Sequence, residues 1–279
     1  MPSGLLFMDK PAGMTSRDID NKIQRLFHTR RVGHLGTLDP FATGLLIVAV
    51  NEATKYLPYL PDEEKTYIAE LVLGKKTDTG DYTGNVVEES PIPSLTHERV
   101  KEVLASMVGS MEQLPPMTSA IKVDGVALYE LAHKGIEVER KKRPIFIHSL
   151  SLLSLDEEKL SFVATVSKGT YIRTLGEDIA ERLGTVGHLS ALRRIKVGQM
   201  DLTHSVTLEE VGEKDLREPS AFIEYPRIEL REEDSRKARN GVKLNFDASS
   251  DRLLLLFEGK ALAIYERQEG TLFRCLRGL

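Results

Sequence analysis

Cysteine is almost absent from this chain. Among its 279 residues only Cys275 carries a thiol, so neither a disulfide within the chain nor a metal site built from several cysteines can form. Long apolar runs are missing too, and none approaches the roughly 18 residues that a membrane helix needs. The apolar stretch Leu5–Met8 is too short for the core of a signal peptide. These absences favour a soluble, cytoplasmic protein without a membrane segment.

An excess of positive charge is also lacking. The net charge is −4, so the overall field gives no indication of a polyanionic partner, and only a local basic surface would support nucleic-acid binding. The hydrophobic share of 41% and the charged share of 29% are ordinary for a globular protein. A chain of this length forms one large domain or two domains with a substantial core.

The segment Arg31–Gly44 is the most distinctive part of the sequence. It reads RVGHLGTLDPFATG, and its glycines and its proline predict a loop rather than a helix or an inner strand. The apolar block Leu45–Val50 follows directly and is typical of a buried strand. A loop that enters a rigid strand is a common position for reactive side chains. Asp39 is the one acid in this loop, and the simpler alternative is that it only forms a turn with Pro40.

The string from Gly33 to Gly44, GHLGTLDPFATG, closely resembles the active-site motif of the TruB family of tRNA pseudouridine synthases. The aspartate of that motif is catalytic in the family, so the resemblance implies that Asp39 is the catalytic residue. Four further strings resemble the family: KPAGMTS at 10–16, KTYIAELVLG at 65–74, GTYIRTL at 169–175 and ALRR at 191–194. The resemblance extends from about residue 4 to about residue 198.

The resemblance implies roles for five more residues. Arg173 would pair with the catalytic aspartate, Tyr67 would lie against the target base, and Tyr171 would line the base pocket. Leu192 would supply an apolar wall, and His34 would fill the space that the base leaves. Simpler alternatives exist: Tyr67 and His34 would be ordinary core residues, and Arg173 would be a surface residue that caps its helix.

Basic residues gather just before the central loop and again in the run RKKR at 140–143. A solvated surface is the alternative for both groups. Their positions favour phosphate contacts, because the first adjoins the candidate site and the second adjoins a segment, about 113–145, that resembles the RNA-gripping insertion of the family. The expected RNA contacts are Lys10, Arg30, Arg31, Arg140, Lys141, Lys142, Arg143 and Arg193. In this insertion Thr118 stands where the family often has tyrosine, and His133–Lys134 stand where an arginine is common.

Residue periodicity predicts both helices and strands. Helices are expected at 15–28, 52–57, 95–107, 128–135 and 169–184, the first of them beginning with a capping box of Thr15 and Asp18. Strands are expected at 4–8, 45–50, 66–73, 162–166, 253–257 and 261–265, with the last two paired. Residues 74–84 are expected to form a loop whose acids, Asp78 and Asp81, are too few for a calcium site, so a structural turn is favoured.

The resemblance implies a mixed α/β fold of the α+β type, the pseudouridine synthase fold. Its central mixed sheet would be mostly antiparallel and flanked by helices and loops. Residues 1–223 would form the catalytic domain. From about residue 224 charged segments alternate with short apolar strands, which predicts a compact β-rich module at 224–279. This module weakly resembles the small PUA-like RNA-binding tail of the family, and the alternative is that it folds onto the main domain.

The chemistry of pseudouridine formation fits these residue types. The reaction breaks an N–C glycosidic bond, rotates the base and joins C5 to the sugar, without net oxidation or hydrolysis, so it needs no redox cofactor, ATP or metal. It does need a carboxylate near the glycosidic centre, and Arg173 would keep Asp39 ionised in a dry pocket. The uridine must leave its stack, which costs a few kcal/mol. The sequence leaves open whether Asp39 attacks the sugar, attacks the base or removes a sugar proton, and whether Tyr67 accepts the C5 proton.

We therefore expect an isomerase, a tRNA pseudouridine(55) synthase, that flips out and modifies the T-loop uridine of tRNA. Its partner would be the T-arm stem–loop, and it would work as a monomer without cofactor, metal or membrane. One alternative is a catalytically silent RNA-binding or tRNA-folding protein on the same fold, against which the intact Asp39, Tyr67 and Arg173 argue. The other is a hydrolytic nucleosidase or glycosidase, which would need a second catalytic acid in a comparable motif.

Overall fold

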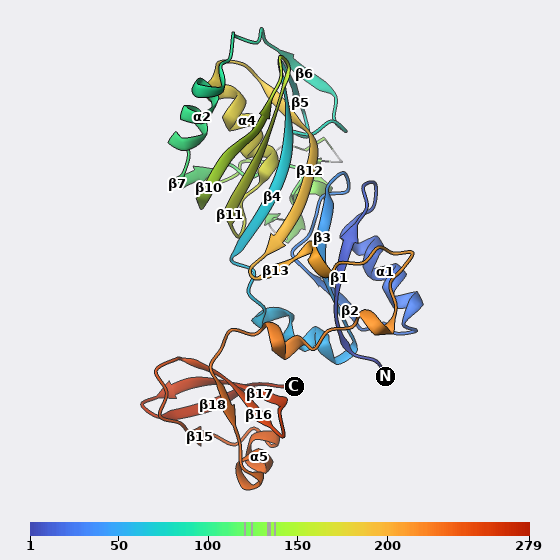
Figure 1. The fold of residues 1–279 in the computed structure, drawn as a ribbon, viewed down its shortest axis with the longest axis vertical. Helices are drawn as coiled ribbons and strands as arrows, with labels where there is room; N and C mark the ends of the chain where they lie inside the picture. The colour runs from blue at the N-terminus through green and yellow to red at the C-terminus, as the bar shows by residue number, and fades with distance from the viewer. Residues whose placement is uncertain (120, 124, 133–134, 137) are drawn as a thin grey trace.

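The structure, a computed structural model, describes residues 1–279 with the exception of 120, 124, 133–134 and 137. The molecule is elongated, with a central sheet and its helices forming the larger part and a small C-terminal sheet at one end of the long axis (Figure 1). No helix in the described part of the chain is long and apolar enough to cross a membrane.

A nine-stranded sheet forms the centre of the larger part. Its main path runs through β1 (Gly4–Lys10), β3 (Thr43–Val50), β12 (Gly187–Val197), β4 (Glu64–Leu73), β11 (Lys159–Ser167), β10 (Arg143–Leu155) and β7 (Gly109–Gln113), while β2 (Val32–Leu35) adds to β3 and β13 (Met200–Asp201) adds to β12. Neighbouring strands are antiparallel, except that β3 and β12 are parallel. The expected mixed, mostly antiparallel sheet is confirmed.

Strand β3 is buried on both faces, as its continuous apolar run predicts. Leu46 and Val48 point into one hydrophobic core, and Leu45 and Ile47 point into a second core on the opposite face. Because successive side chains of a strand alternate between its faces, this one strand contributes side chains to both cores. The Asp39 loop enters the sheet at the start of this buried strand.

Helices cover the first core; they are α1 (Ser16–Leu26), α2 (His97–Ser106) and α4 (Ile172–Leu183). Helix α1 begins at the predicted capping box, in which the side chains of Thr15 and Asp18 bond each other's backbone N–H groups. Helix α4 packs on β12 and β4 beside α2, and ends where Gly184 adopts the left-handed conformation. The alternation predicted for residues 66–73 is confirmed in β4, which buries one face against this core.

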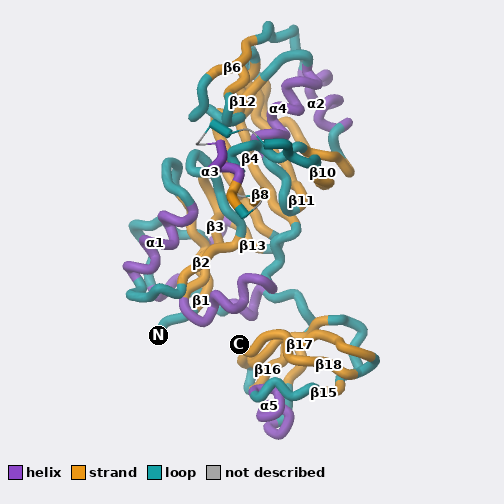
Figure 2. The backbone as a smooth tube through the Cα atoms, turned by 180° about the vertical axis from the view of Figure 1, so that it is seen from behind, coloured by secondary structure: helices purple, strands orange, loops and turns teal. Residues whose placement is uncertain are grey.

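Short elements complete the larger part. They are the 3-10 helices η1 (Asn51–Tyr59), η2 (Leu202–His204), η3 (Glu213–Asp215) and η4 (Pro219–Phe222), the hairpin of β5 (Lys75–Thr77) with β6 (Val86–Glu89), the hairpin of β8 (Lys122–Val123) with β9 (Val126–Ala127), and helix α3 (Leu128–Ala132). Seen from behind, α3 and β8 lie in front of the central strands (Figure 2). They belong to the segment 113–145, which the family resemblance predicts to be an RNA-gripping insertion.

Some local expectations need correction. The predicted loop 31–44 begins with β2, which pairs with β3 on one side only, and a glycine is tolerated in such an edge strand. The predicted loop 74–84 contains β5, whose polar residues give no apolar alternation. The predicted helix 52–57 is a 3-10 helix that continues through Pro58. The predicted helix 128–135 is α3, which ends at Ala132; His133 and Lys134 lie outside the described residues.

The C-terminal part is a five-stranded sheet with one helix. The strand order is β14 (Arg227–Glu229), β16 (Arg252–Phe257), β17 (Lys260–Glu269), β18 (Leu272–Gly278) and β15 (Leu244–Asn245), and α5 (Glu232–Arg239) packs beside it. The predicted hairpin of β16 with β17 is confirmed. Tyr265 and Phe273 form a local core, whereas Leu254 and Ile264 join the second core of the central sheet. The C-terminal part therefore has its own core and also packs on the larger part.

Candidate functional site

Asp39 lies on the loop between β2 and β3, and the N-terminal segment fixes both of its neighbours. The Leu38 N–H donates to the Ser16 hydroxyl at the start of α1, at 2.9 Å. On the other side, Lys10 Nζ donates to the Pro40 carbonyl at 3.2 Å. The position of the Asp39 backbone is thus determined by the packing of β1 and α1 against the loop.

Arg173, in the first turn of α4, forms an ion pair with Asp39. Its Nη2 donates to Asp39 Oδ1 at 3.0 Å, and its Nε lies 2.9 Å from Oδ2, although that N–H is not well directed for a hydrogen bond. The Arg173 side chain is 4% exposed, whereas 33% of the Asp39 side chain is exposed. The pair that the resemblance implies is therefore present, and its carboxylate still faces an opening.

The remaining contacts of Arg173 hold the guanidinium in place. Its Nη1 donates to the Thr79 carbonyl at 3.0 Å, and its Nη2 donates to the Thr118 carbonyl at 2.9 Å. The Thr118 hydroxyl accepts a further bond from Nη1. A second carboxylate, Asp81 Oδ2, lies 3.9 Å from Nη1. Thr118, which departs from the family pattern, thus links the insertion to the candidate site.

These charges act on the Asp39 carboxyl in opposite directions. Burial raises the pKa of Asp39 above its ordinary value, the charge and hydrogen bond of Arg173 lower it, and the charge of Asp81 raises it. A carboxylate that is poorly solvated but paired with a fixed cation keeps its charge available for reaction. This is the electrostatic arrangement expected for a catalytic carboxylate.

Tyr67 and Leu192 lie on the neighbouring strands β4 and β12, and both are buried. They belong to the same hydrophobic core as Leu38 and Phe41, which flank the candidate catalytic aspartate. Burial raises the pKa of the Tyr67 phenol, and the negative charge of the aspartate adds to the rise. The structure therefore brings Tyr67 and Leu192 to the core beside the loop.

Tyr171 and His34 are anchored by side chains that the sequence analysis did not single out. The Tyr171 backbone is held at the start of α4 by Gln113, whose amide accepts from the Tyr171 N–H at 2.8 Å and donates to its carbonyl at 3.1 Å. His34 Nδ1 lies 2.9 Å from Asp20 Oδ2, and Asp20 is buried on α1. The Tyr171 backbone and the His34 ring are therefore fixed. Each residue is close in sequence to one member of the Asp39–Arg173 pair.

The expected RNA contacts differ in accessibility. The exposed ones are Arg30, Arg31, Lys141, Lys142 and Arg143, of which Arg31 pairs with Glu52. Arg140 is half-buried and donates to the Pro115 carbonyl at 2.9 Å. Arg193 donates to both carboxylate oxygens of Asp9, at 2.9 and 2.7 Å, while 39% of its side chain stays exposed.

Lys10 departs from the expectation. It has no exposed surface, and its Nζ donates to the carbonyls of Pro11, Met14 and Pro40 at 2.9, 2.6 and 3.2 Å. Burial lowers the pKa of Lys10 to about 8, while the charge of Asp39 opposes this change. Lys10 therefore supports the loop from inside rather than contacting RNA phosphates.

Sequence reasoning missed Arg194. It follows Leu192 by two positions on β12, and strand alternation therefore turns it toward the interior, where it is completely buried. Its Nε donates to the Leu45 carbonyl at 2.8 Å, and its Nη2 donates to the Gly36 carbonyl at 2.9 Å. An arginine at an inward position of a strand was the signal that could have identified it.

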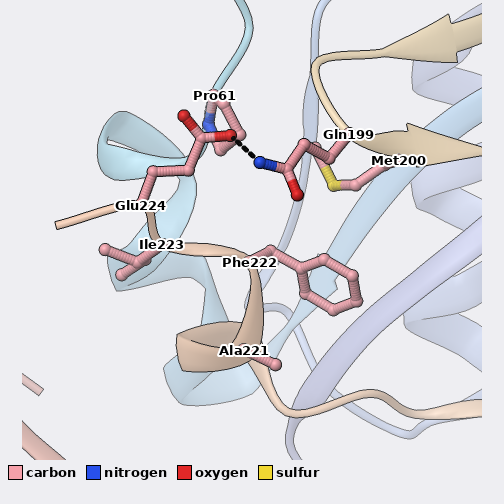
Figure 3. Close-up of a pocket in the computed structure, with 7 residues that line it drawn as sticks. All are labelled: Pro61, Gln199, Met200, Ala221, Phe222, Ile223 and Glu224. Atoms are coloured by element: carbon pink, nitrogen blue, oxygen red, sulfur yellow. Dashed lines mark hydrogen bonds between the residues drawn. The ribbon is translucent and has the colours of Figure 1, made fainter. Parts of the chain in front are cut away.

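A pocket of about 320 Å³ lies elsewhere, between the β12–β13 turn and the segment leading to the C-terminal part (Figure 3). Its lining residues are Pro61, Gln199, Met200, Ala221, Phe222, Ile223 and Glu224. Gln199 Nε2 donates to Glu224 Oε1 at 2.8 Å across it. Because none of the candidate residues lines this pocket, it is separate from the site. Within the described part of the chain, no group of three or more His, Cys, Asp or Glu side chains is arranged to hold a metal ion.

Two family models match adjoining parts of the chain. The model described as TruB family pseudouridylate synthase (N terminal domain) matches residues 24–172. The model described as tRNA pseudouridylate synthase B C-terminal domain matches residues 173–221. The first match contains Asp39, and the second begins at Arg173, so the ion pair joins the two matched regions.

Curated relatives named tRNA pseudouridine synthase B match nearly the whole chain. The protein from Syntrophotalea carbinolica is 43% identical, with 94% of this chain and 91% of that protein covered. The protein from Azoarcus sp. is 42% identical, with 96% and 92% covered. Among solved structures, a chain of a Cbf5–Nop10–Gar1 complex matches with a TM-score of 0.75 at 20% identity, covering 99% of this chain and 84% of that chain. At this identity the likeness shows the fold alone.

Proposed function

Because the chain belongs to the TruB family of pseudouridylate synthases, we propose that it isomerises uridine to pseudouridine in tRNA, at position 55 in the T loop. In this proposal the protein is an isomerase, a tRNA pseudouridine(55) synthase. The observation that carries the proposal is the ion pair of Asp39 with Arg173, which brings together two motifs 134 residues apart.

Asp39 supplies the carboxylate that acts while the glycosidic bond breaks. Arg173 keeps this carboxylate ionised and fixes its direction through the paired contacts at 3.0 and 2.9 Å. The reaction then requires rotation of the base, bond formation from C5 to the sugar, and loss of the C5 proton. Tyr67, buried in the same core, stacks on the base and is the candidate to accept that proton.

Leu192 and Tyr171 complete the walls of the base pocket in this proposal. The target uridine has to be flipped out of its stack, and apolar and aromatic surface in the pocket offsets the cost of a few kcal/mol. His34, whose ring is held by Asp20, fills the space that the base leaves in the T loop. The exposed residues Arg30, Lys141, Lys142 and Arg143 contact the phosphates of the T arm, and the half-buried Arg140 adds to their positive charge.

A hydrolytic carboxylate enzyme would need a second acid that reaches the substrate. Asp81 is the nearest candidate, but it is buried, and its Oδ1 accepts from the backbone and the hydroxyl of Thr83. Its other oxygen faces Arg173. Asp81 therefore supports the arginine, and an isomerase is favoured over a glycosidase. A catalytically silent RNA-binding protein would not need a carboxylate that is partly exposed and held by a buried arginine, as Asp39 is by Arg173.

We also propose that residues 1–223 form the catalytic domain and that 224–279 form a PUA-like module that adds RNA contacts. The separate core around Tyr265 supports this division. We propose that the protein acts in the cytoplasm. We also propose that it acts as a monomer, because Asp39, Tyr67 and Arg173 all belong to one chain and the site needs no second copy.

The test uses an isolated T-arm stem–loop with tritium at C5 of the target uridine. Pseudouridine formation replaces the C5–H bond by a bond to the sugar, so the label should appear in water without any added cofactor and with a chelator present. Asp39→Asn keeps the shape but removes the charge, and should abolish release while RNA binding persists. The matched control Asp156→Asn changes an exposed acid in the turn between β10 and β11 and should react like wild type.

Several outcomes would refute parts of this proposal. Turnover by purified Asp39→Asn would remove Asp39 from its role. An inert stem–loop beside a reactive whole tRNA would contradict recognition of the T arm alone, and loss of activity with chelator would contradict a metal-free reaction. The same sequence in a full duplex should stay unreacted, because flipping must also break base pairing there.

A further inference from the structure

Arg194 is the largest completely buried side chain among the described residues. Within the described part of the chain no carboxylate pairs with it, whereas Arg173 and Arg193 each pair with an aspartate. Moving an unpaired charge from water into a protein interior is strongly unfavourable. A buried guanidinium without a counter-ion therefore indicates a use of its charge beyond packing.

Two nitrogens of Arg194 hold the backbone around the catalytic loop. Nε binds the Leu45 carbonyl at the start of β3, and Nη2 binds the Gly36 carbonyl, three residues before Asp39. The third nitrogen, Nη1, is buried and has no hydrogen-bond partner of good geometry among the described residues. It lies next to Gly36, since a Cβ added to this glycine would be 3.3 Å from Nη1. One donor nitrogen of the guanidinium therefore takes no part in holding the loop backbone.

Tyr67 is the residue opposite Arg194. The two are partners in the antiparallel register of β4 and β12, and both are buried, so their side chains lie on the same face of the sheet. Burial raises the pKa of the Tyr67 phenol, whereas the positive charge of Arg194 lowers it. The arginine therefore favours negative charge on the phenol oxygen in a place where burial disfavours it.

We propose that Arg194 is a positioning residue for Tyr67, which holds the phenol beside the catalytic loop and stabilises the phenolate that accepts the C5 proton. This inference rests on the proposed function. In the step, the O–H bond of Tyr67 forms as the C5–H bond of the rotated base breaks, and the electron pair of that bond returns to the uracil ring. Arg194 exchanges no proton and stays a cation throughout.

A purely structural clamp is the competing explanation. A clamp needs donors for the carbonyls of Leu45 and Gly36 but no charge, because a neutral amide also donates. Arg194→Gln keeps a donor group and removes the charge. Arg194→Lys keeps the charge but loses the planar arrangement of N–H donors that a guanidinium has. The charge and the fork can therefore be tested separately.

The experiment compares kcat for tRNA with hydrogen and with deuterium at C5 of the target uridine. We expect Arg194→Gln to lower kcat by about tenfold or more with little change in KM, since proton transfer is impaired while RNA binding is not. Its deuterium effect should exceed that of wild type, and its kcat should continue to rise at higher pH because the phenol pKa is higher. Arg194→Lys should lie closer to wild type. The control Lys196→Met removes an exposed cation from the same strand and should change none of these values.

A double-mutant cycle tests the dependence on Tyr67. In a Tyr67→Phe background, Arg194→Gln should lower the residual single-turnover rate by less than about twofold, because the group it acts through is gone. Equal losses in the two backgrounds, or equal deuterium effects in Arg194→Gln and wild type, would overturn the inference. If Arg194→Gln does not fold, as judged by circular dichroism, Arg194→Lys decides: a wild-type deuterium effect is then the expected result, whereas a large loss of rate that is equal in the wild-type and Tyr67→Phe backgrounds would overturn the inference. Absence of C5 release by wild type would instead refute the proposed function, and the inference with it.

Discussion

Replacement of Arg173 by methionine would measure what the ion pair contributes to catalysis. Asp39 would lose both of its contacts to the guanidinium, at 3.0 and 2.9 Å. Removing one preorganised partner of a charge in an active site typically costs about 2.7–4 kcal/mol of transition-state stabilisation. The lower value applies here, because 33% of the Asp39 side chain is exposed and water screens its charge. About 3 kcal/mol lost from the transition state corresponds to a decrease in kcat/KM of roughly a hundredfold.

The pH dependence of kcat/KM gives the sign of this effect. Burial raises the pKa of Asp39 and Arg173 lowers it, so loss of Arg173 raises this pKa further. Since the ionised carboxylate is the active form in the proposed mechanism, the acidic limb of the profile should move to higher pH, and the defect should be larger at acidic than at neutral pH. Release of tritium from C5-labelled tRNA measures the profile.

The result that would refute this reasoning is a pair of parallel profiles, with the same defect at every pH. Arg173→Lys is the matched control, because it keeps the positive charge but loses the planar fork. Its acidic limb should stay near that of wild type even though its rate falls. A limb that moves equally in both variants would mean that geometry, and not charge, sets the ionisation of Asp39.

Three further changes have outcomes that the structure determines. Asp81→Asn should move the acidic limb of kcat/KM to lower pH, because the charge of Asp81 raises the pKa of Asp39; an upward shift would contradict this. Alanine at all four basic residues 140–143 should reduce the slope of log affinity against log salt by up to about 3, at roughly 0.7–0.9 per phosphate contact, and an unchanged slope would mean that the run faces solvent. Gly44→Ala should lower the free energy of unfolding by more than about 2 kcal/mol in urea titrations. The reason is that Gly44 has a φ of +99° and an added Cβ would lie 2.2 Å from the Arg194 carbonyl, so a midpoint near wild type would contradict this close contact.

Strongly periodic segments could be predicted from the sequence. The alternation of residues 66–73 identified β4, and the capping box of Thr15 and Asp18 located the start of α1. In both cases the local pattern and the tertiary packing agree. The polar strand β5 and the glycine-containing edge strand β2 were read as loops, because pairing with a neighbour, and not apolar periodicity, makes them strands.

Contacts between distant segments could not be derived from periodicity. Asp39 and Arg173 are 134 residues apart, and only the family resemblance indicated that they pair. Lys10 is among the expected RNA contacts, yet it is the last residue of a buried strand and has no exposed surface. Arg194 was missed because a basic neighbour precedes it and a bulge follows it, which together obscure its inward position.

The parallel contact between β3 and β12 joins segments far apart in the sequence, and we expect it to form late in folding. The Thr43 hydroxyl donates to the Leu192 carbonyl 149 residues away. Closing a loop of this length costs about 4 kcal/mol of chain entropy, so we expect hairpins such as β10 with β11 to form earlier. The candidate site lies beside this contact between β3 and β12, since Asp39 stands just before β3 and Leu192 lies on β12. A nascent chain that has not yet released β12 would therefore lack Leu192 and Arg194, and we expect isomerisation to begin only after β12 has joined the sheet.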